Sequence, residues 1–321
     1  MSGHWAEQRE RGSVFAMKLL IRITGLFGRG AALVLLYPVS FYYLLFARRA
    51  THALREYLTR VFGRPPTWIE LFRHYYSFAI TLLDRGLLLS GQTPQLDFSS
   101  ENVDVVRRLA QRERGCLLLG AHMGSFDVAR LLGEVHRHTA IHMMMYEENA
   151  RKINAVFESI GGKSRMSVIP IGAVDALLQV EERLNRGEWV GILGDRLVTS
   201  ERVVRVPFFG RPAVFPAGPF LMASALKVPV VLFASLYHGG NLYKEYFELF
   251  AEEITLDRRN RDADLERWVR RYAERLEHYC RLAPYNWFNF YEFWDAAPQL
   301  APQSASAVTP VLSDPIQKVT R

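Results

Sequence analysis

Short apolar runs alternate with helical patterns through most of the chain. Six apolar runs are candidate strands: "CLLLGA", "AIHMMMY", "SVIPI", "WVGILG", "VPVVLFASLYH" and "KEYFELF". Apolar residues recur every three or four positions in segments between and after these runs, which predicts helices near residues 126–136, 150–160, 174–185, 217–226 and 262–282. Strands that alternate with helices predict an α/β fold, in which helices flank a mixed, mostly parallel sheet.

Two further helices are expected before the first strand, because residues 51–95 follow a helical pattern that Pro65 and Pro66 interrupt. After Trp294 the chain has four prolines and few large apolar residues, a composition typical of disorder. The pattern therefore divides the chain into four parts: a leader (residues 1–14), an apolar N-terminal segment (15–49), one large folded domain (50–295) and a disordered tail (296–321).

The apolar N-terminal segment predicts a membrane anchor. An uncharged stretch of 17 residues, 30–46, lies between Arg29 on one side and Arg48 and Arg49 on the other. A helix of that length measures about 25 Å, slightly less than the ~30 Å hydrocarbon core of a bilayer. We therefore expect an anchor that is partly inserted and partly interfacial, and a buried core helix is the alternative.

Basic residues and a proline refine this expectation. If the helix is continuous, Lys18, Arg22 and Arg29 fall on one face, as in a helix that lies on anionic headgroups. Pro38 is expected to kink the helix.

Charge and cysteine content limit the partners and the compartment. Lys and Arg number 40 against 33 Asp and Glu, a net charge of +7, which favours anionic partners such as a phospholipid surface, an acidic protein or nucleic acid. Nucleic acid fits poorly, because aromatic residues do not interleave with Lys and Arg in any recognised module. Cys116 and Cys280 are the only two cysteines, which suits reduced thiols in a cytoplasmic setting.

The candidate chemistry begins in "GAHMGSFDVAR", where His122 and Asp127 are five positions apart. In one helix they would be about 140° apart, so they can meet only if a strand ends and a helix begins between them. Gly124 and Ser125 supply the turn and the N-cap for that boundary. His122 would then be a general base whose tautomer Asp127 fixes. The alternative is a partly buried core histidine.

A second segment, "EWVGILGDR", repeats the design, because Asp195 and Arg196 follow an apolar strand. Downstream, "RVVRVPFFGR" offers Arg205 and Arg211 for contacts with phosphate groups, and a solvated basic face is the alternative.

Two other clusters carry weaker signals. "HRHTAIH" contains three histidines, but no acidic or cysteine ligands cluster near them, so we predict no metal and no other cofactor. The aromatic segment "PYNWFNFYEFW", residues 284–294, favours packing against the sheet over contact with a membrane.

The ordered set of these segments carries a family resemblance. The blocks "AHMGSFD", "GILGDR" and "VPFFGRPAVFPAGP", together with the N-terminal "LLYPVSFYYLLF", resemble the bacterial lipid A late acyltransferases of the lysophospholipid acyltransferase superfamily. The similarity covers about residues 5 to 295. It implies transfer of a fatty acyl group from an acyl carrier protein or coenzyme A thioester to a hydroxyl of a lipid-linked acceptor, such as a lipid A precursor or another glycolipid.

The resemblance also assigns roles to residues. The family's His-x4-acid pair matches His122 as general base and Asp127 as its partner, although many lipid A enzymes have Glu at the second position. Related enzymes have a further acid that contacts the histidine, and Asp195 occupies its place. The family also uses a positively charged residue between these two blocks, and Arg165 is the closest match to it in this chain. We further expect Arg196, Gly124, Ser125, Arg205 and Arg211 to contact substrate.

Two other functions stay open from the residues themselves. A lipid esterase needs a reactive serine near His122, for which Ser125 and Ser224 are candidates, but the chain has no Gly-x-Ser-x-Gly elbow. The second of these alternatives is a non-catalytic membrane protein that binds lipid. The expected location is the bacterial inner membrane, with the folded domain on the cytoplasmic side.

Overall fold

A computed structural model describes residues 14–92, 95–125, 139–145, 168–173, 175–197 and 202–294. Several of the sequence predictions lie outside these ranges: the helices near residues 126–136 and 150–160, the tail, and four individual side chains, Asp127, His136, His138 and Arg165.

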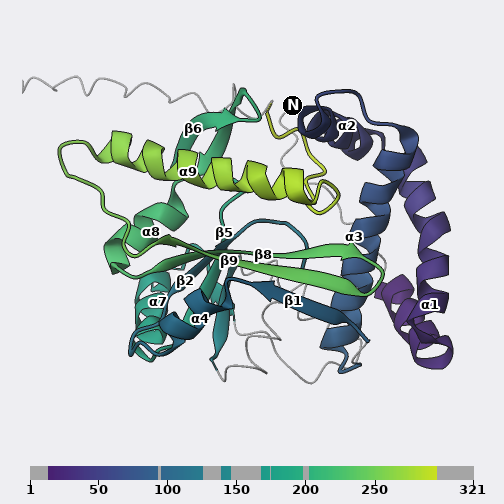
Figure 1. Cartoon of the computed structure of the whole chain (residues 1–321), viewed down its shortest axis with the longest axis horizontal. Coiled ribbons are helices and arrows are strands. Elements are labelled where there is room, and N and C mark those ends of the chain that lie inside the picture. Colours follow the sequence, from purple (N-terminus) through teal and green to yellow (C-terminus); the bar gives the residue numbers. More distant parts are fainter. Residues whose placement is uncertain are drawn as a thin grey trace, which may run out of the picture.

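A seven-stranded sheet forms the centre of the molecule (Figure 1). Its order across the sheet is β1 (Asp97–Glu101), β9 (Leu242–Ala251), β8 (Val230–Gly239), β2 (Leu117–Gly120), β5 (Trp189–Leu193), β3 (Ile141–Met145) and β4 (Val168–Pro170). Neighbouring strands are parallel except β8 and β9. All six predicted strands are present, and the mixed, mostly parallel α/β fold is confirmed.

Apolar cores lie on both faces of this sheet. On β2, Leu117 and Leu119 belong to the larger core, beneath α9 (Arg261–Leu282) and the two-stranded sheet of β6 (Val203–Phe208) and β7 (Arg211–Pro216). Leu118 belongs to the smaller core, beneath α4 (Val103–Ala110). Burial on both faces explains why the strands read as unbroken apolar runs. The predicted helices at residues 174–185, 217–226 and 262–282 are confirmed as α7 (Ala176–Asn185), α8 (Gly218–Leu226) and α9.

The sequence patterns do not predict four elements: β1, α4 and the two strands β6 and β7. Strand β1 is polar and exposed along its whole length, so it has no alternating pattern to detect. Helix α4 is a short helix of 8 residues. The β6–β7 hairpin carries prolines, with Pro207 opposite Pro212, which argue against a strand on general grounds. Its turn residues Phe209 and Gly210 both have positive φ, the conformation that tight hairpins require.

The N-terminal third of the described chain is helical: α1 (Val14–Phe46), α2 (Arg48–Phe62) and α3 (Trp68–Leu89). The predicted break at Pro65 and Pro66 is confirmed. Helix α2 ends at Gly63, which has a left-handed φ of 68°, and α3 begins with a capping box between Thr67 and Glu70.

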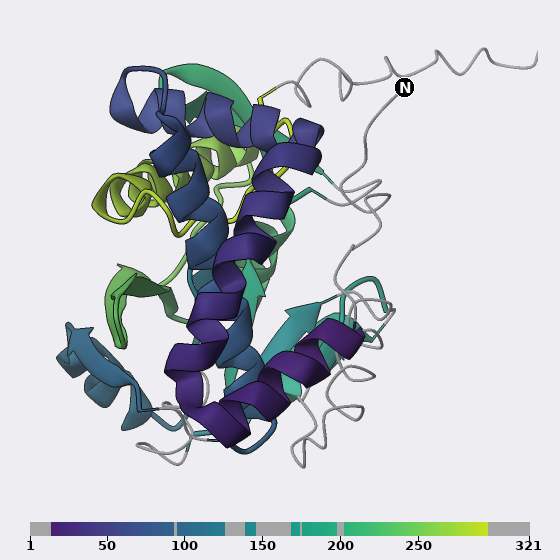
Figure 2. The same cartoon turned by 90° about the vertical axis from the view of Figure 1, so that its right-hand side faces the viewer.

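The kink expected in α1 is at a different residue. The backbone leaves the helical region at Gly28 (φ 81°, ψ 167°), and Pro38 lies inside the second arm. Glycine reaches this conformation without a Cβ clash. The second arm is held by packing, because its Ala32 and Leu36 share a core with Ile80 of α3. Figure 2 shows the two arms meeting at an angle.

The predicted basic stripe on α1 is also wrong for one residue. Arg29 follows the Gly28 break and turns inward, where its Nε and Nη2 donate to the two carboxylate oxygens of the buried Asp84 at 2.7 and 2.8 Å. The Tyr243 hydroxyl donates to the same carboxylate at 2.8 Å. Arg29 therefore joins α1 to α3 and β9, and only Lys18 and Arg22 of the predicted stripe remain on the first arm.

One helix among the described residues, Lys18–Phe46, is long and apolar enough to cross a membrane by length and composition. A signal sequence or a core helix of a soluble protein passes the same test, although only 17% of its most apolar window is buried. The helix is therefore weak evidence for membrane anchoring.

Candidate active site

The two candidate residues His122 and Asp195 follow neighbouring strands. Strands β2 and β5 are parallel, with Gly120 opposite Leu193, and each candidate side chain comes two residues after that pair. The carboxyl ends of parallel strands meet at one edge of a sheet, where α/β proteins place their ligands. The register therefore brings His122 and Asp195 together.

The contact between them is direct. His122 Nδ1 is 2.8 Å from Asp195 Oδ1, and the backbone nitrogen of His122 is 3.0 Å from each carboxylate oxygen. Asp195 is 1% exposed, whereas the imidazole is 32% exposed. An ionised carboxylate only accepts hydrogen bonds, so Nδ1 carries the proton and Nε2 is the ring nitrogen that can accept one.

The turn after His122 depends on a glycine. Gly124 has a φ of +58°, and a Cβ there would be 1.8 Å from the carbonyl oxygen of Ser235 on β8. Its N–H donates to the carbonyl of Asn286 at 2.8 Å, and the N–H of Ser125 donates to the carbonyl of Ser235 at 2.9 Å. These contacts fix the loop that carries His122.

Two residues of the aromatic segment 284–294, Trp287 and Phe288, contact the candidate pair. The N–H of Phe288 donates to the carbonyl of His122 at 2.9 Å, and the indole N–H of Trp287 donates to Asp195 Oδ2 at 2.9 Å. Trp287 and Trp294 are both buried, so the predicted packing role is confirmed. The contact of this segment with His122 and Asp195 was not predicted from the sequence. The signals available for it were the polar Asn286 and the indole donor of Trp287 among the aromatic residues.

Arg196 places a positive charge beside this pair. Its Nη2 donates to the carbonyl of Phe288 at 2.9 Å, and its guanidinium carbon is 6.0 Å from the centre of the Tyr291 ring. Because the N–H of Phe288 donates to the carbonyl of His122, two successive hydrogen bonds through Phe288 link the guanidinium to the histidine.

Burial and charge set the protonation states. The pKa of His122 is lowered, first by burial and then by the charge of Arg196, against the opposing effect of Asp195; Arg85 of α3 also lowers it. Burial alone would raise the pKa of Asp195, but His122, Arg196 and the Trp287 N–H together outweigh it and lower that pKa. At neutral pH the pair is a neutral imidazole beside a carboxylate, the state a general base requires.

The sequence model described as bacterial lipid A biosynthesis acyltransferase matches residues 10–295. The chain belongs to this family. It is therefore an acyltransferase that transfers an acyl group from a donor onto a lipid acceptor. A direct comparison with curated protein sequences gives no match. The matched range contains the whole constellation of His122, Asp195, Arg196 and the aromatic segment.

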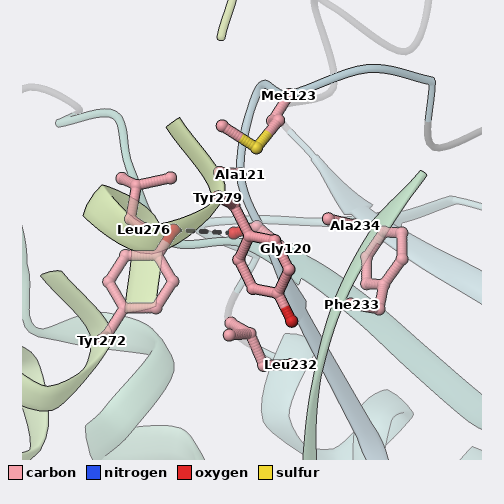
Figure 3. Close-up of a pocket in the computed structure, with 9 residues that line it drawn as sticks. All are labelled: Gly120, Ala121, Met123, Leu232, Phe233, Ala234, Tyr272, Leu276 and Tyr279. Atoms are coloured by element: carbon pink, nitrogen blue, oxygen red, sulfur yellow. Dashed lines mark hydrogen bonds between the residues drawn. The ribbon is translucent and has the colours of Figure 1, made fainter. Parts of the chain in front are cut away.

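A narrow crevice opens next to the histidine of this family member (Figure 3). Ala121 and Met123, the two neighbours of His122, line it together with β8 residues and with Tyr272 and Leu276 of α9. The Tyr272 hydroxyl donates to the carbonyl of Gly120 at 2.8 Å, which ties α9 to the end of β2. The crevice has room for about one water molecule.

Arg205 and Arg211, two further predicted substrate contacts, are exposed on the β6–β7 hairpin, a separate small sheet, and Arg211 is 4.0 Å from Glu56 of α2. The structure therefore groups Gly124, Ser125, Asp195 and Arg196 with His122, and places these two arginines on the neighbouring two-stranded sheet.

No group of three or more potential metal ligands occurs among the described residues. Of the three candidate histidines, only His142 lies within them. It is buried on β3, with Nε2 2.7 Å from Glu188 Oε2. Cys116 and Cys280 are buried free thiols.

Proposed function

We propose that the protein is a membrane-associated O-acyltransferase, with His122 as its general base. The acceptor is a hydroxyl of a lipid A precursor or a related glycolipid, and the donor is a fatty acyl thioester of acyl carrier protein or coenzyme A. The reaction would take place on the cytoplasmic side of the bacterial inner membrane. The observation that carries the proposal is the partly exposed imidazole, held through Nδ1 by a buried carboxylate at the carboxyl ends of the parallel strands.

The chemistry needs one base and a bound thioester. Nε2 of His122 takes the proton of the acceptor hydroxyl as its oxygen attacks the thioester carbonyl. The tetrahedral oxyanion then collapses, the carbon–sulfur bond breaks, and the thiolate takes the proton from the imidazolium. A thioester is already activated, so direct transfer in a ternary complex needs no covalent enzyme intermediate.

Neighbouring charges suit both states of the base. The carboxylate of Asp195 stabilises the imidazolium that forms during attack. Arg196, anchored at Phe288, supplies a positive charge for the oxyanion or for a phosphate of the donor or acceptor. Asp127 and Arg165 keep the roles that the family resemblance implies, as a partner of His122 and a substrate contact.

A serine esterase is disfavoured by the positions of both candidate nucleophiles. Ser125 is 5% exposed. Ser224 is on α8, which leads into the amino end of β8, whereas His122 follows the carboxyl end of the parallel strand β2. The two ends lie at opposite edges of the sheet, so Ser224 is remote from the base.

Membrane association is supported by the outer face of α1. Large apolar side chains are exposed there: Leu26, Phe27, Val34, Phe41, Tyr42 and Phe46. The inner face packs on α3, and Phe78 of α3 lies 5.1 Å, ring to ring, from Phe288 beside His122. A bilayer on the outer face of α1 would thus lie two helical layers from the base (Figures 1 and 2).

The decisive experiment incubates purified protein in detergent with isotopically labelled acyl carrier protein and coenzyme A thioesters and with lipid A precursors or other glycolipids. Mass analysis of the lipids should show a new ester that carries the labelled chain. Free labelled fatty acid without an acylated lipid would instead indicate a hydrolase. No product with any donor, while the lipid still binds, would indicate a lipid-binding protein.

A vesicle assay tests the membrane face separately. We expect the protein to sediment with phosphatidylglycerol vesicles. The double variant Phe41→Asp, Tyr42→Asp should lose most of that binding. Leu178→Asp, exposed on α7 at the opposite side of the molecule from α1 (Figure 1), is the matched control and should bind as the wild type does. Equal binding by all three proteins would overturn the assignment of α1.

A further inference from the structure

We propose that Trp287 is a positioning residue for acyl transfer, whose indole N–H fixes the carboxylate of Asp195 and through it the reactive imidazole. The proposal rests on the function proposed above, because it concerns the same histidine. It assigns a chemical role to a side chain that otherwise reads as part of an aromatic core.

Hydrogen bonds to both oxygens hold the carboxylate of Asp195. Asp195 Oδ1 accepts from the His122 ring at 2.8 Å and from the His122 backbone at 3.0 Å. Oδ2 shares that same backbone N–H, at 3.0 Å, and among the described residues it has one further donor, the Trp287 indole at 2.9 Å. Within this part of the chain, the indole is therefore the donor that ties the carboxylate to a position outside the residue that it orients.

Packing holds the indole of Trp287 in place. Trp287 is 0% exposed. Its ring lies 4.9 Å from Tyr57 of α2, 5.5 Å from Phe208 of β6 and 5.1 Å from Phe293, all in edge-to-face arrangements. Such packing restricts an aromatic side chain to one rotamer. The donor therefore has a fixed position relative to three separate parts of the fold.

The indole also moderates the charge that His122 meets. A hydrogen bond to Oδ2 disperses the negative charge of the carboxylate and weakens it as an acceptor at Oδ1. Removal of the indole N–H leaves a stronger but less fixed partner for the imidazole. The imidazolium is then favoured, so a higher pH is needed to free the base, while misorientation slows the proton transfer.

A matched pair of variants separates this role from packing. Trp287→Phe removes the donor to Asp195 and keeps an aromatic ring in the cluster. Trp294→Phe is the control, because Trp294 is also buried, lies 6.4 Å from Trp287 ring to ring, and donates its indole N–H to the carbonyl of Phe208 at 3.1 Å instead of to the site. Both variants lose one buried indole hydrogen bond from the same cluster.

The experiment measures kcat and KM for acyl transfer from pH 5 to pH 9, together with the titration of His122 by NMR of protein labelled with ¹⁵N-histidine. For Trp287→Phe we expect kcat to fall about tenfold, KM to change less than about twofold, and the acidic limb of kcat/KM and the pKa of His122 to move up by about half a unit. Trp294→Phe should lower stability but leave the limb and the titration in place.

Either of two results would overturn the proposal: a pH profile of Trp287→Phe that superimposes on the wild type, or the same shift in both variants. If the wild-type protein transfers no acyl group, the proposed function fails. The titration of His122 in the two variants then still decides whether Trp287 tunes the pair.

Discussion

Among the described residues, two histidine–carboxylate pairs lie at the sheet, and they differ in the properties that a general base requires. His122 and Asp195 follow the carboxyl ends of β2 and β5, whereas His142 near the amino end of β3 meets Glu188 immediately before β5. The contact distances, 2.8 and 2.7 Å, are almost equal. A short histidine–carboxylate contact is therefore insufficient as a mark of an active site.

The pairs differ in which partner is buried. At the catalytic candidate the imidazole is 32% exposed and the carboxylate 1%, while at the other pair the imidazole is 7% exposed and the carboxylate 23%. A general base must expose its ring to substrate and keep its orienting acid fixed. The His142 pair has the opposite arrangement, which suits an anchor for the start of a strand.

The largest expected effect is on the two histidines themselves. His122→Asn should lower kcat for acyl transfer by about 10³-fold or more, because no base remains at the sheet edge. His142→Asn should leave kcat within about threefold, although it lowers thermal stability. Steady-state kinetics on both purified variants make the comparison, and equal losses would show that the exposed imidazole is not special.

Substitution of the two carboxylates should separate the pairs in the same direction, with a smaller difference in kcat. Asp195→Asn leaves a similar shape yet removes the charge that stabilises the imidazolium, so kcat should fall about 10²-fold. Glu188→Gln should change kcat little. The measurement is the ratio of the two kcat values at pH 8, and a ratio near one would remove Asp195 from the mechanism.

A pair of glycines tests how tightly the catalytic end is built. Gly124 and Gly172 both have positive φ, but a Cβ at Gly124 meets the Ser235 carbonyl at 1.8 Å, whereas one at Gly172 meets nothing within 4 Å. Gly172→Ala should cost about 1 kcal/mol of unfolding free energy from strain alone. Gly124→Ala should cost about 2 kcal/mol more, because the loop must shift. Denaturant titration compares them, and equal costs would contradict the close approach.

The smallest effect concerns a third histidine, His74, which is fully buried on α3. Burial, only partly offset by the Pro284 carbonyl, lowers its pKa to about 3. In the unfolded chain this histidine has an ordinary pKa near 6.5, so it takes up a proton at a higher pH than it does in the folded protein. The free energy of unfolding therefore keeps its full contribution from the neutral His74 above about pH 6.5. That contribution declines toward pH 3, by up to about 1.4 kcal/mol per pH unit.

His74→Phe should flatten that decline, which melting temperatures from pH 7 to pH 4.5 would detect. The exposed His52 offers the control, because His52→Gln should keep the wild-type slope. An unchanged slope in His74→Phe would mean that other groups carry the acid sensitivity.

The sequence patterns predict much of the fold and two central residues of the candidate site, for physical reasons. Strands buried on both faces, such as β2 and β5, leave unbroken apolar runs, and the residues after them identify His122 and Asp195. The exposed strand β1 leaves no such pattern. The break at Gly28 was missed because a proline at position 38 is the stronger local signal, whereas packing against α3 keeps that part of the helix continuous.

Contacts across long stretches of chain were beyond local patterns. Trp287 reaches Asp195 from 92 positions away, and Arg29 reaches Asp84 across 55. Neither spacing has a sequence signature, since each depends on how complete elements pack. The arginines of the β6–β7 hairpin show the converse, because a basic segment close to Asp195 and Arg196 in the sequence folds into a separate two-stranded sheet.

The pH dependence of kcat/KM for wild-type acyl transfer tests the central claim most directly. A base must be deprotonated to act, so the rate falls as the pH drops through the pKa of His122. Burial and the charge of Arg196 lower that pKa, so the acidic limb should lie below pH 6.5, with no loss of rate between pH 6.5 and 8. A limb above pH 6.5 would contradict a neutral His122 as the base.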